Sequence, residues 1–81
     1  MKIAIFGAGY VGLSLSVLFS RNLKVSVNLF DINQDVIDSL NNNQPHINDQ
    51  DIKFSFLNEK LNLNVLHIDY LRDIHDFYII A

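Results

Sequence analysis

The sequence predicts an α/β fold, an open, doubly wound sheet of parallel strands, of which about four strands are present. Apolar runs of strand length alternate with stretches of helical spacing along the 81 residues, which favours parallel strands joined by crossover connections. Three glycines fall in one six-residue stretch directly after the first apolar run, and an acidic residue ends the second. These observations predict the strand order 3-2-1-4 of a doubly wound sheet.

The first part of the chain predicts a strand, a helix and a second strand. Lys2 to Phe6 is a short apolar run that ends at a glycine, which is typical of a strand buried on both faces. A helix is expected from the glycines to about Asn22, with an apolar face made by Val11, Leu15, Leu18 and Phe19. Lys24 to Phe30 alternates apolar and polar residues and ends at Asp31, which predicts the second strand.

The remaining elements follow from caps and periodicity. Asn33 is a candidate N-cap for a helix through Leu40, with Asp35 complementing the dipole in its first turn. Asn41, Asn42 and Asn43 are expected to end that helix, because asparagine tolerates the left-handed conformation. We also expect a short helix over 51–57, a third strand over 61–68, a turn over 69–75 and a fourth strand over 77–81.

Composition excludes several classes of function. Six Lys and Arg stand against nine Asp and Glu, giving net charge −3, and no basic cluster exists, so we expect no nucleic-acid partner. The absence of cysteine excludes a disulfide framework, a thiolate metal site and a cysteine nucleophile, and it fits a reducing cytoplasm. The uncharged run Ile3–Ser20 has the outline of a signal or membrane segment. Its glycines, serines and changing period favour a soluble domain without a membrane partner.

The glycine turn and Asp31 form the candidate binding site. A pyrophosphate needs closely spaced donors, and a helix N-terminus supplies free N–H groups and a favourable dipole. Gly7 would allow the tight turn, Gly9 the close approach of the phosphates, and Gly12 the packing of helix on strand. Tyr10 and Val11 would supply N–H groups.

Asp31 would accept hydrogen bonds from the adenosine ribose and repel a 2′-phosphate, which favours NAD over NADP. It follows Gly12 by nineteen positions, the spacing of a Rossmann dinucleotide fingerprint. We therefore expect residues 1–81 to be a partial NAD-binding Rossmann domain. FAD enzymes use the same turn, and a turn without ligand, with Asp31 as an ordinary strand-end carboxylate, is the plainer alternative.

No catalytic or metal site is predicted. The three histidines lie far apart without the spacing of metal ligands, and each is interpreted as a loop or strand-edge residue: His46, His67 and His75. Asp35 and Asp38 lie three apart on a predicted helix, where a solvated face is the default interpretation. Asp73, His75 and Asp76 precede the last strand and are expected to have structural roles. No pairing of nucleophile and base is present.

A resemblance to a known family adds to these inferences. The segment Met1–Leu15, and within it Tyr10–Ser14, resembles the N-terminus of the nucleotide-sugar dehydrogenases of the UDP-glucose/GDP-mannose dehydrogenase family, especially the UDP-glucose 6-dehydrogenases. The resemblance continues through Asp31-Ile32, Lys60–Leu63 and Asp76–Ala81. It differs at Val36, where the family usually has a basic residue near the adenosine, and at Asn43, where glycine is common.

The resemblance implies an NAD-dependent oxidoreductase that converts UDP-glucose to UDP-glucuronate with two NAD per turnover, as part of nucleotide-sugar metabolism and polysaccharide biosynthesis. It implies a cytoplasmic enzyme, a homodimer when full length, whose catalytic residues are not among these 81. Because the apolar run 77–81 has no turn or helix after it, we expect the sequence to be a fragment. The fragment alone is expected to be inactive. A nucleotide-sensing regulatory Rossmann domain without catalysis is the alternative.

Overall fold

Four parallel strands form one sheet, and the computed structural model describes all residues from Met1 to Ala81. The strands are β1 (Lys2–Phe6), β2 (Ser26–Asp31), β3 (Leu63–His67) and β4 (Phe77–Ile80). The helices are α1 (Tyr10–Ser20), α2 (Gln34–Asn41), α3 (Gln50–Asn58) and the 3-10 turn η1 (Ile68–Tyr70). The order across the sheet is β3-β2-β1-β4, which confirms the predicted order and fold class.

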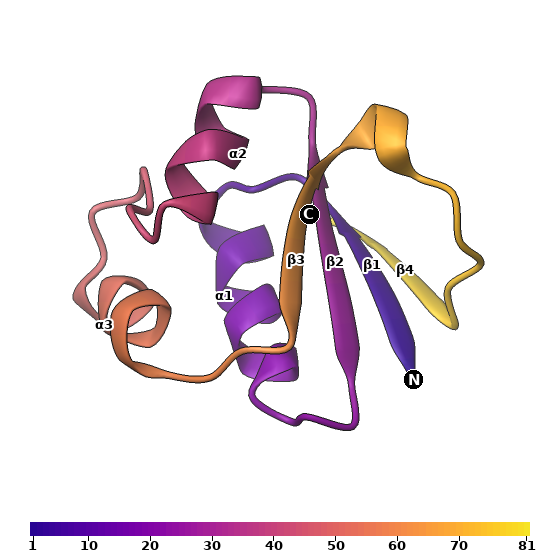
Figure 1. Ribbon diagram of the computed structural model, residues 1–81, viewed down its shortest axis with the longest axis horizontal. Coiled ribbons are helices and arrows are strands. Elements are labelled where there is room, and N and C mark those ends of the chain that lie inside the picture. The colour runs from indigo at the N-terminus through magenta and orange to yellow at the C-terminus, as the bar shows by residue number, and fades with distance from the viewer.

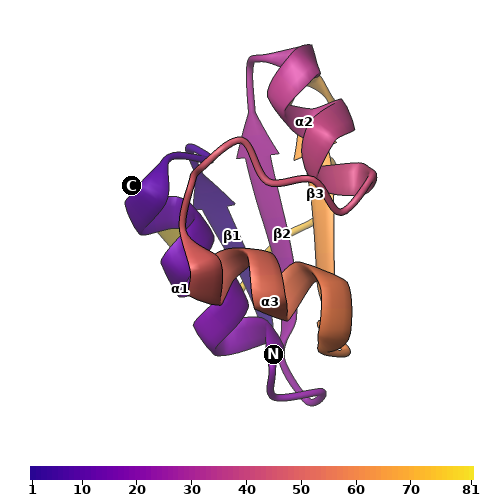
Figure 2. The same ribbon diagram turned by 90° about the vertical axis from the view of Figure 1, so that its left-hand side faces the viewer.

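The three α-helices lie on one face of the sheet, and the connection from β3 to β4 passes over the other face (Figures 1 and 2). The chain therefore changes direction at β1: β2 and β3 are added on one side of it and β4 on the other. In such sheets ligands bind where the strand order reverses, at the carboxyl ends of the strands. The glycine turn after β1 lies at this position.

The main hydrophobic core lies between the sheet and the helices. Alternate residues of β1 and β2 point into it, because successive side chains of a strand face opposite sides. They pack against one face of each helix; the core residues with the lowest exposure are Ile5, Leu13, Val27 and Leu29, with Ile37, Leu40, Ile52, Phe56 and Val65 around them. Burial of this cluster holds the turn after β1 between two rigid elements.

Three predicted strands are shorter in the structure, and the one expected over 77–81 ends at Ile80. The second begins at Ser26 instead of Lys24, and the third spans Leu63–His67 instead of 61–68. The backbone before β2 is held by the 2.9 Å hydrogen bond from the Val25 N–H to the Asn22 carbonyl, which closes a turn. The alternation of apolar and polar residues extends beyond the strands into these turns, because Val25 and Leu61 still pack against the core.

The predicted apolar face of the first helix was correct for Leu15 and Phe19, which pack against the core, and wrong for Val11 and Leu18. Val11 and Leu18 are each 57% exposed, whereas the buried residues of α1 are Gly12, Leu13, Ser16, Val17 and Ser20. The small residues Gly12, Ser16 and Ser20 share the buried face with Leu13 and Val17, because Gly12 holds the start of α1 close to the turn after β1. The helix also ends at Ser20 rather than near Asn22. No helix in the structure is long and apolar enough to cross a membrane.

The caps of α2 confirm the prediction from the asparagines. The side chain of Asn33 accepts hydrogen bonds from the N–H groups of Asp35, at 3.0 Å, and Val36. At the other end the helix stops at Asn41, and Asn43 adopts the left-handed conformation with φ 57°. After glycine, asparagine is the residue that adopts the left-handed conformation with the least loss of free energy.

We expect Asn43→Val to lower the free energy of unfolding by about 1–2 kcal/mol, because a β-branched residue is strained at this positive φ. The matched control is Asn42→Val, at an exposed neighbouring position where φ is −94°. Asn42→Val should lower the free energy of unfolding by less than half as much as Asn43→Val. Urea unfolding of the two variants measures the difference, and equal losses would contradict the role of the backbone conformation.

The second face of the sheet carries a polar network, centred on the buried Asn28 and His75, under the β3–β4 connection. The Asn64 amide donates to Asn28 Oδ1 at 3.1 Å, and Asn28 Nδ2 lies 2.8 Å from His75 Nε2. His75 Nδ1 lies 3.0 Å from the Asp73 carbonyl, so Nδ1 carries the proton of the neutral imidazole. His75 is 5% exposed and packs edge-on against Phe30 and Tyr78. This network fixes the connection on the sheet, a structural role as predicted for His75.

Candidate functional site: the glycine turn and the carboxyl edge

Gly7 and Gly12 make the turn after β1 possible in two different ways: one by its backbone conformation and one by the absence of a side chain. Gly7 has φ +104°, a conformation that favours glycine, and its N–H donates to the Phe30 carbonyl at 2.8 Å. Gly12 lies against this turn: a Cβ built on it would be 1.8 Å from the Gly7 carbonyl oxygen. Gly12 is therefore required for the close contact between α1 and the turn, the role predicted for it.

Gly9 faces open space instead. A Cβ built on it would meet no atom within 4 Å, and it occupies the N-cap of α1 without any side-chain cap. The first backbone bond of the helix is donated by Leu13 to the Gly9 carbonyl, at 2.9 Å. The N–H groups of the preceding turn are those that an α-helix leaves free at its start. An open, uncapped helix start with no acidic residue in its first turn fits a pyrophosphate group.

Asp31 joins two turns at the end of β2. Its Oδ2 accepts from the Ala8 N–H at 2.8 Å, and its Oδ1 accepts from the Asn33 N–H at 2.8 Å. Burial raises the pKa of this carboxyl, but hydrogen bonds from these two N–H groups and from that of Ile32 outweigh the burial. The charge of His46 lowers the pKa further. The net pKa lies below its ordinary value, so the group is ionised at neutral pH.

The six predicted binding residues are brought together at one edge of the sheet. Gly7, Gly9 and Gly12 form the turn, and the hydrogen bond from Ala8 ties Asp31 to it. The side chains of Tyr10 and Val11 point outward and are each 57% exposed, so only their backbone faces the turn. Sequence reasoning missed Ala8, whose N–H is the link; its position between two glycines was the available signal.

The other candidates lie apart from this site. The structure contains no group of three His, Cys, Asp or Glu side chains that could hold a metal ion. Asp38 is exposed, and its carboxylate accepts from the Gln34 side chain at 2.8 Å, the solvated role expected for it. Asp73 pairs with the Lys2 ammonium at 3.2 Å, and Asp76 accepts from the Lys2 N–H at 2.7 Å. These two carboxylates hold the β3–β4 connection at the amino end of β1.

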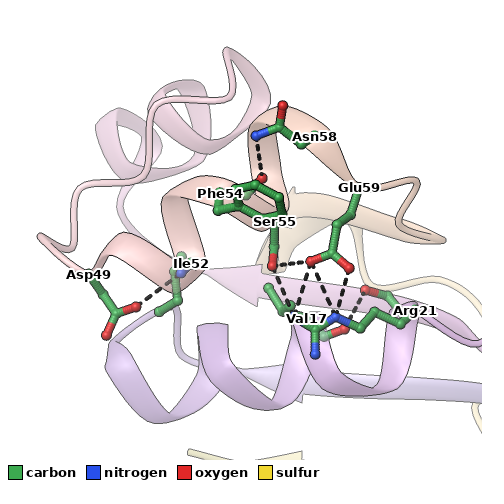
Figure 3. A network of polar contacts seen from close by, with 9 residues as sticks. Val17, Arg21, Asp49, Ile52, Phe54, Ser55, Asn58 and Glu59 are labelled. Carbon is green, nitrogen blue, oxygen red and sulfur yellow. Dashed lines mark hydrogen bonds and ion pairs between the residues drawn. The ribbon is translucent and has the colours of Figure 1, made fainter.

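A surface groove lies between α1 and α3 and extends from Tyr10 to Arg21 along α1; Figure 3 shows the polar network of this region. At one end of the groove, Arg21 forms an ion pair with Glu59 at 3.1 Å and donates to Ser55 at 3.1 Å. Ser55 also hydrogen-bonds Glu59, and hydrogen bonds from Ser55 and Arg21 lower the pKa of that carboxyl. Since its polar groups are paired with one another, the network joins two helices and offers no reactive group.

Fold and turn together define the class: a parallel Rossmann-type sheet with a glycine-lined helix start and a strand-end aspartate is a dinucleotide-binding domain. Residues 1–80 match the family described as "UDP-glucose/GDP-mannose dehydrogenase family, NAD binding domain". The chain belongs to this family, whose members are nucleotide-sugar dehydrogenases that use NAD.

Known proteins of the family are similar to this chain over much of its length. It is 44% identical over 63 residues to the UDP-glucose 6-dehydrogenase of Streptococcus pneumoniae, and 43% over 67 residues to that of Campylobacter jejuni. These alignments cover 78% and 83% of the chain. They cover 16% of each relative, so the chain spans about a sixth of their length.

Two solved structures share the fold. The UDP-N-acetyl-mannosamine dehydrogenase of Staphylococcus aureus matches the whole chain with a TM-score of 0.78 and 32% identity, over 19% of its own length. A UDP-glucose dehydrogenase from Pyrobaculum islandicum matches 79% of the chain with a TM-score of 0.67 and 25% identity, over 15% of its length.

Proposed function

We propose that residues 1–81 are the first part of the NAD-binding domain of a UDP-glucose 6-dehydrogenase, and that they bind the adenosine diphosphate half of NAD. The observation that carries this proposal is the pairing of an open helix start at Gly9 with the ionised carboxylate of Asp31, tied to the same turn by Ala8. The names of the relatives favour UDP-glucose as the substrate.

Each part of the site would have one task. The free N–H groups of Tyr10 and Val11 would donate to the pyrophosphate, aided by the positive end of the α1 dipole. Gly9 keeps that surface clear of side-chain atoms. Asp31 would accept hydrogen bonds from the ribose hydroxyls while the Ala8 and Asn33 N–H groups hold its two oxygens. NAD, when bound, supplies the hydride acceptor for oxidation of the C6 alcohol.

These residues bind and orient; they include no group that we assign to proton transfer or to covalent chemistry. Conversion of a primary alcohol to a carboxylate removes two hydrides, so one UDP-glucose would consume two NAD and one water. We propose that the catalytic residues belong to a longer polypeptide. That complete enzyme would be a cytoplasmic homodimer, not bound to membrane, that supplies UDP-glucuronate for polysaccharide biosynthesis.

Two measurements test this proposal. We expect the 81-residue chain to show no NADH formation from UDP-glucose and only weak NAD binding by calorimetry, because it holds one half of the cofactor site. The product of the whole reading frame that contains these residues should form two NADH per UDP-glucose. If that product binds NAD but does not oxidise UDP-sugars, a regulatory domain is favoured. Tight NAD binding by the 81-residue chain would contradict the proposal that it holds only one half of the cofactor site.

A further inference from the structure

The carboxyl edge of the sheet continues past Asp31 to His67. Asp31 and His67 are register partners at the ends of β2 and β3, so their Cα atoms lie about 4.8 Å apart and their side chains face the same side of the sheet. Along this edge the order is the glycine turn of β1, then Asp31 of β2, then His67 of β3. A nucleotide with its phosphates on the turn and its ribose on Asp31 would therefore place its base toward His67.

The His67 ring presents one free donor. Its Nδ1 accepts a hydrogen bond from the Asp69 N–H at 3.1 Å and lies 3.4 Å from Asp69 Oδ2, so both neighbours of Nδ1 belong to Asp69 and the ring N–H available to a ligand is that of Nε2. The side chain is 23% exposed, and no protein atom accepts from Nε2. Ile32, directly after Asp31, is 76% exposed. A ring donor without a protein partner, on the strand next to an exposed apolar side chain, suits a purine, which has flat faces and ring nitrogens that accept hydrogen bonds.

We propose that His67 is a specificity residue for the adenine of NAD, and that its Nε2–H donates to an acceptor nitrogen of the base. This assignment rests on the proposed function, because the ribose must lie on Asp31 for the base to reach His67. It also gives the adenosine a contact from β3, where Val36 on α2 offers no charged side chain.

Two variants separate this role from the cap that His67 provides to η1. His67→Asn keeps a side-chain oxygen that can accept from the Asp69 N–H, as Asn33 does at the start of α2, but has no donor at the position of Nε2. His67→Gln restores an amide donor near that position. A merely structural role would therefore be preserved in His67→Asn, and the binding role would not.

The test is an NMR titration of the 81-residue chain and its two variants with ADP and with ribose 5-diphosphate, which lacks the base. We expect His67→Asn to bind ADP about 3- to 10-fold more weakly than the unchanged chain, the effect of one lost hydrogen bond. Its affinity for ribose 5-diphosphate should not change, and His67→Gln should recover most of the ADP affinity.

Three results would overturn the assignment. Equal ADP affinity in the unchanged chain and His67→Asn would remove His67 from base recognition while leaving the proposed function intact. Equal losses for both probes would show that the variant acts on the fold or the phosphates rather than on the base. Failure of the unchanged chain to bind ADP at all would overturn the proposed function, and the role of His67 with it.

Discussion

Substitution of Gly12 by alanine should destabilise this protein by about 3 kcal/mol or more, because overpacking against rigid backbone cannot be relieved by a rotamer change. The added Cβ would lie 1.8 Å from the Gly7 carbonyl oxygen, so α1 or the turn must move. Gly7 itself is held by its hydrogen bond to Phe30 and by a positive φ. We expect thermal unfolding to begin at a much lower temperature in Gly12→Ala.

Gly9→Ala is the matched control, with the same added methyl group three residues earlier. Its Cβ would meet no protein atom, so the loss of stability should stay near the 0.5–1 kcal/mol of a poorer N-cap, on the order expected for such a change. NAD affinity should nevertheless fall, because the methyl group occupies the surface proposed for the pyrophosphate. A stable Gly9→Ala protein with unchanged NAD affinity would contradict that placement, and a stable Gly12→Ala protein would contradict the close packing.

Asp31→Asn should weaken NAD binding by about 10- to 100-fold, the scale of hydrogen bonds that a carboxylate accepts. The variant should also discriminate less against NADP, because the charge that repels a 2′-phosphate is lost. The fold should lose about 1–3 kcal/mol as well, since one amide nitrogen would face the N–H of Ala8 or Asn33 and leave it unpaired. Calorimetric titration of the complete enzyme with NAD and NADP measures both affinities.

The control for Asp31 is Asp35→Asn, which removes the same charge from the exposed first turn of α2. It should change neither cofactor selectivity nor acid stability by a comparable amount. Because the pKa of Asp31 is lowered by folding, its stabilisation is complete above about pH 4 and is lost as the pH falls through the folded-state pKa. Asp31→Asn should lack this part of the acid sensitivity; equal acid profiles would remove the structural role of the carboxylate.

Local patterns predicted much of the fold because they report local requirements. The glycine at position 7 predicted a tight turn, and Asn33 and the asparagines at 41–43 predicted the ends of α2. Apolar spacing predicted the buried face of α1 only in part, because Leu15 and Phe19 pack against the core but Val11 and Leu18 do not. The orientation of α1 is decided by the contact of Gly12 with the turn, so the face with Gly12, Leu13 and Val17 is buried and Val11 and Leu18 are exposed.

The site divides in the same way. Its six candidate residues could be proposed from the sequence because glycines and a strand-end acid at this spacing indicate a local geometry, the start of a helix beside a strand. The bond from Ala8 to Asp31 and the register that brings His67 beside Asp31 join segments 23 and 36 positions apart. Only the tertiary structure decided these contacts, because parallel pairing is set by the packing of the whole sheet and not by residues near in sequence.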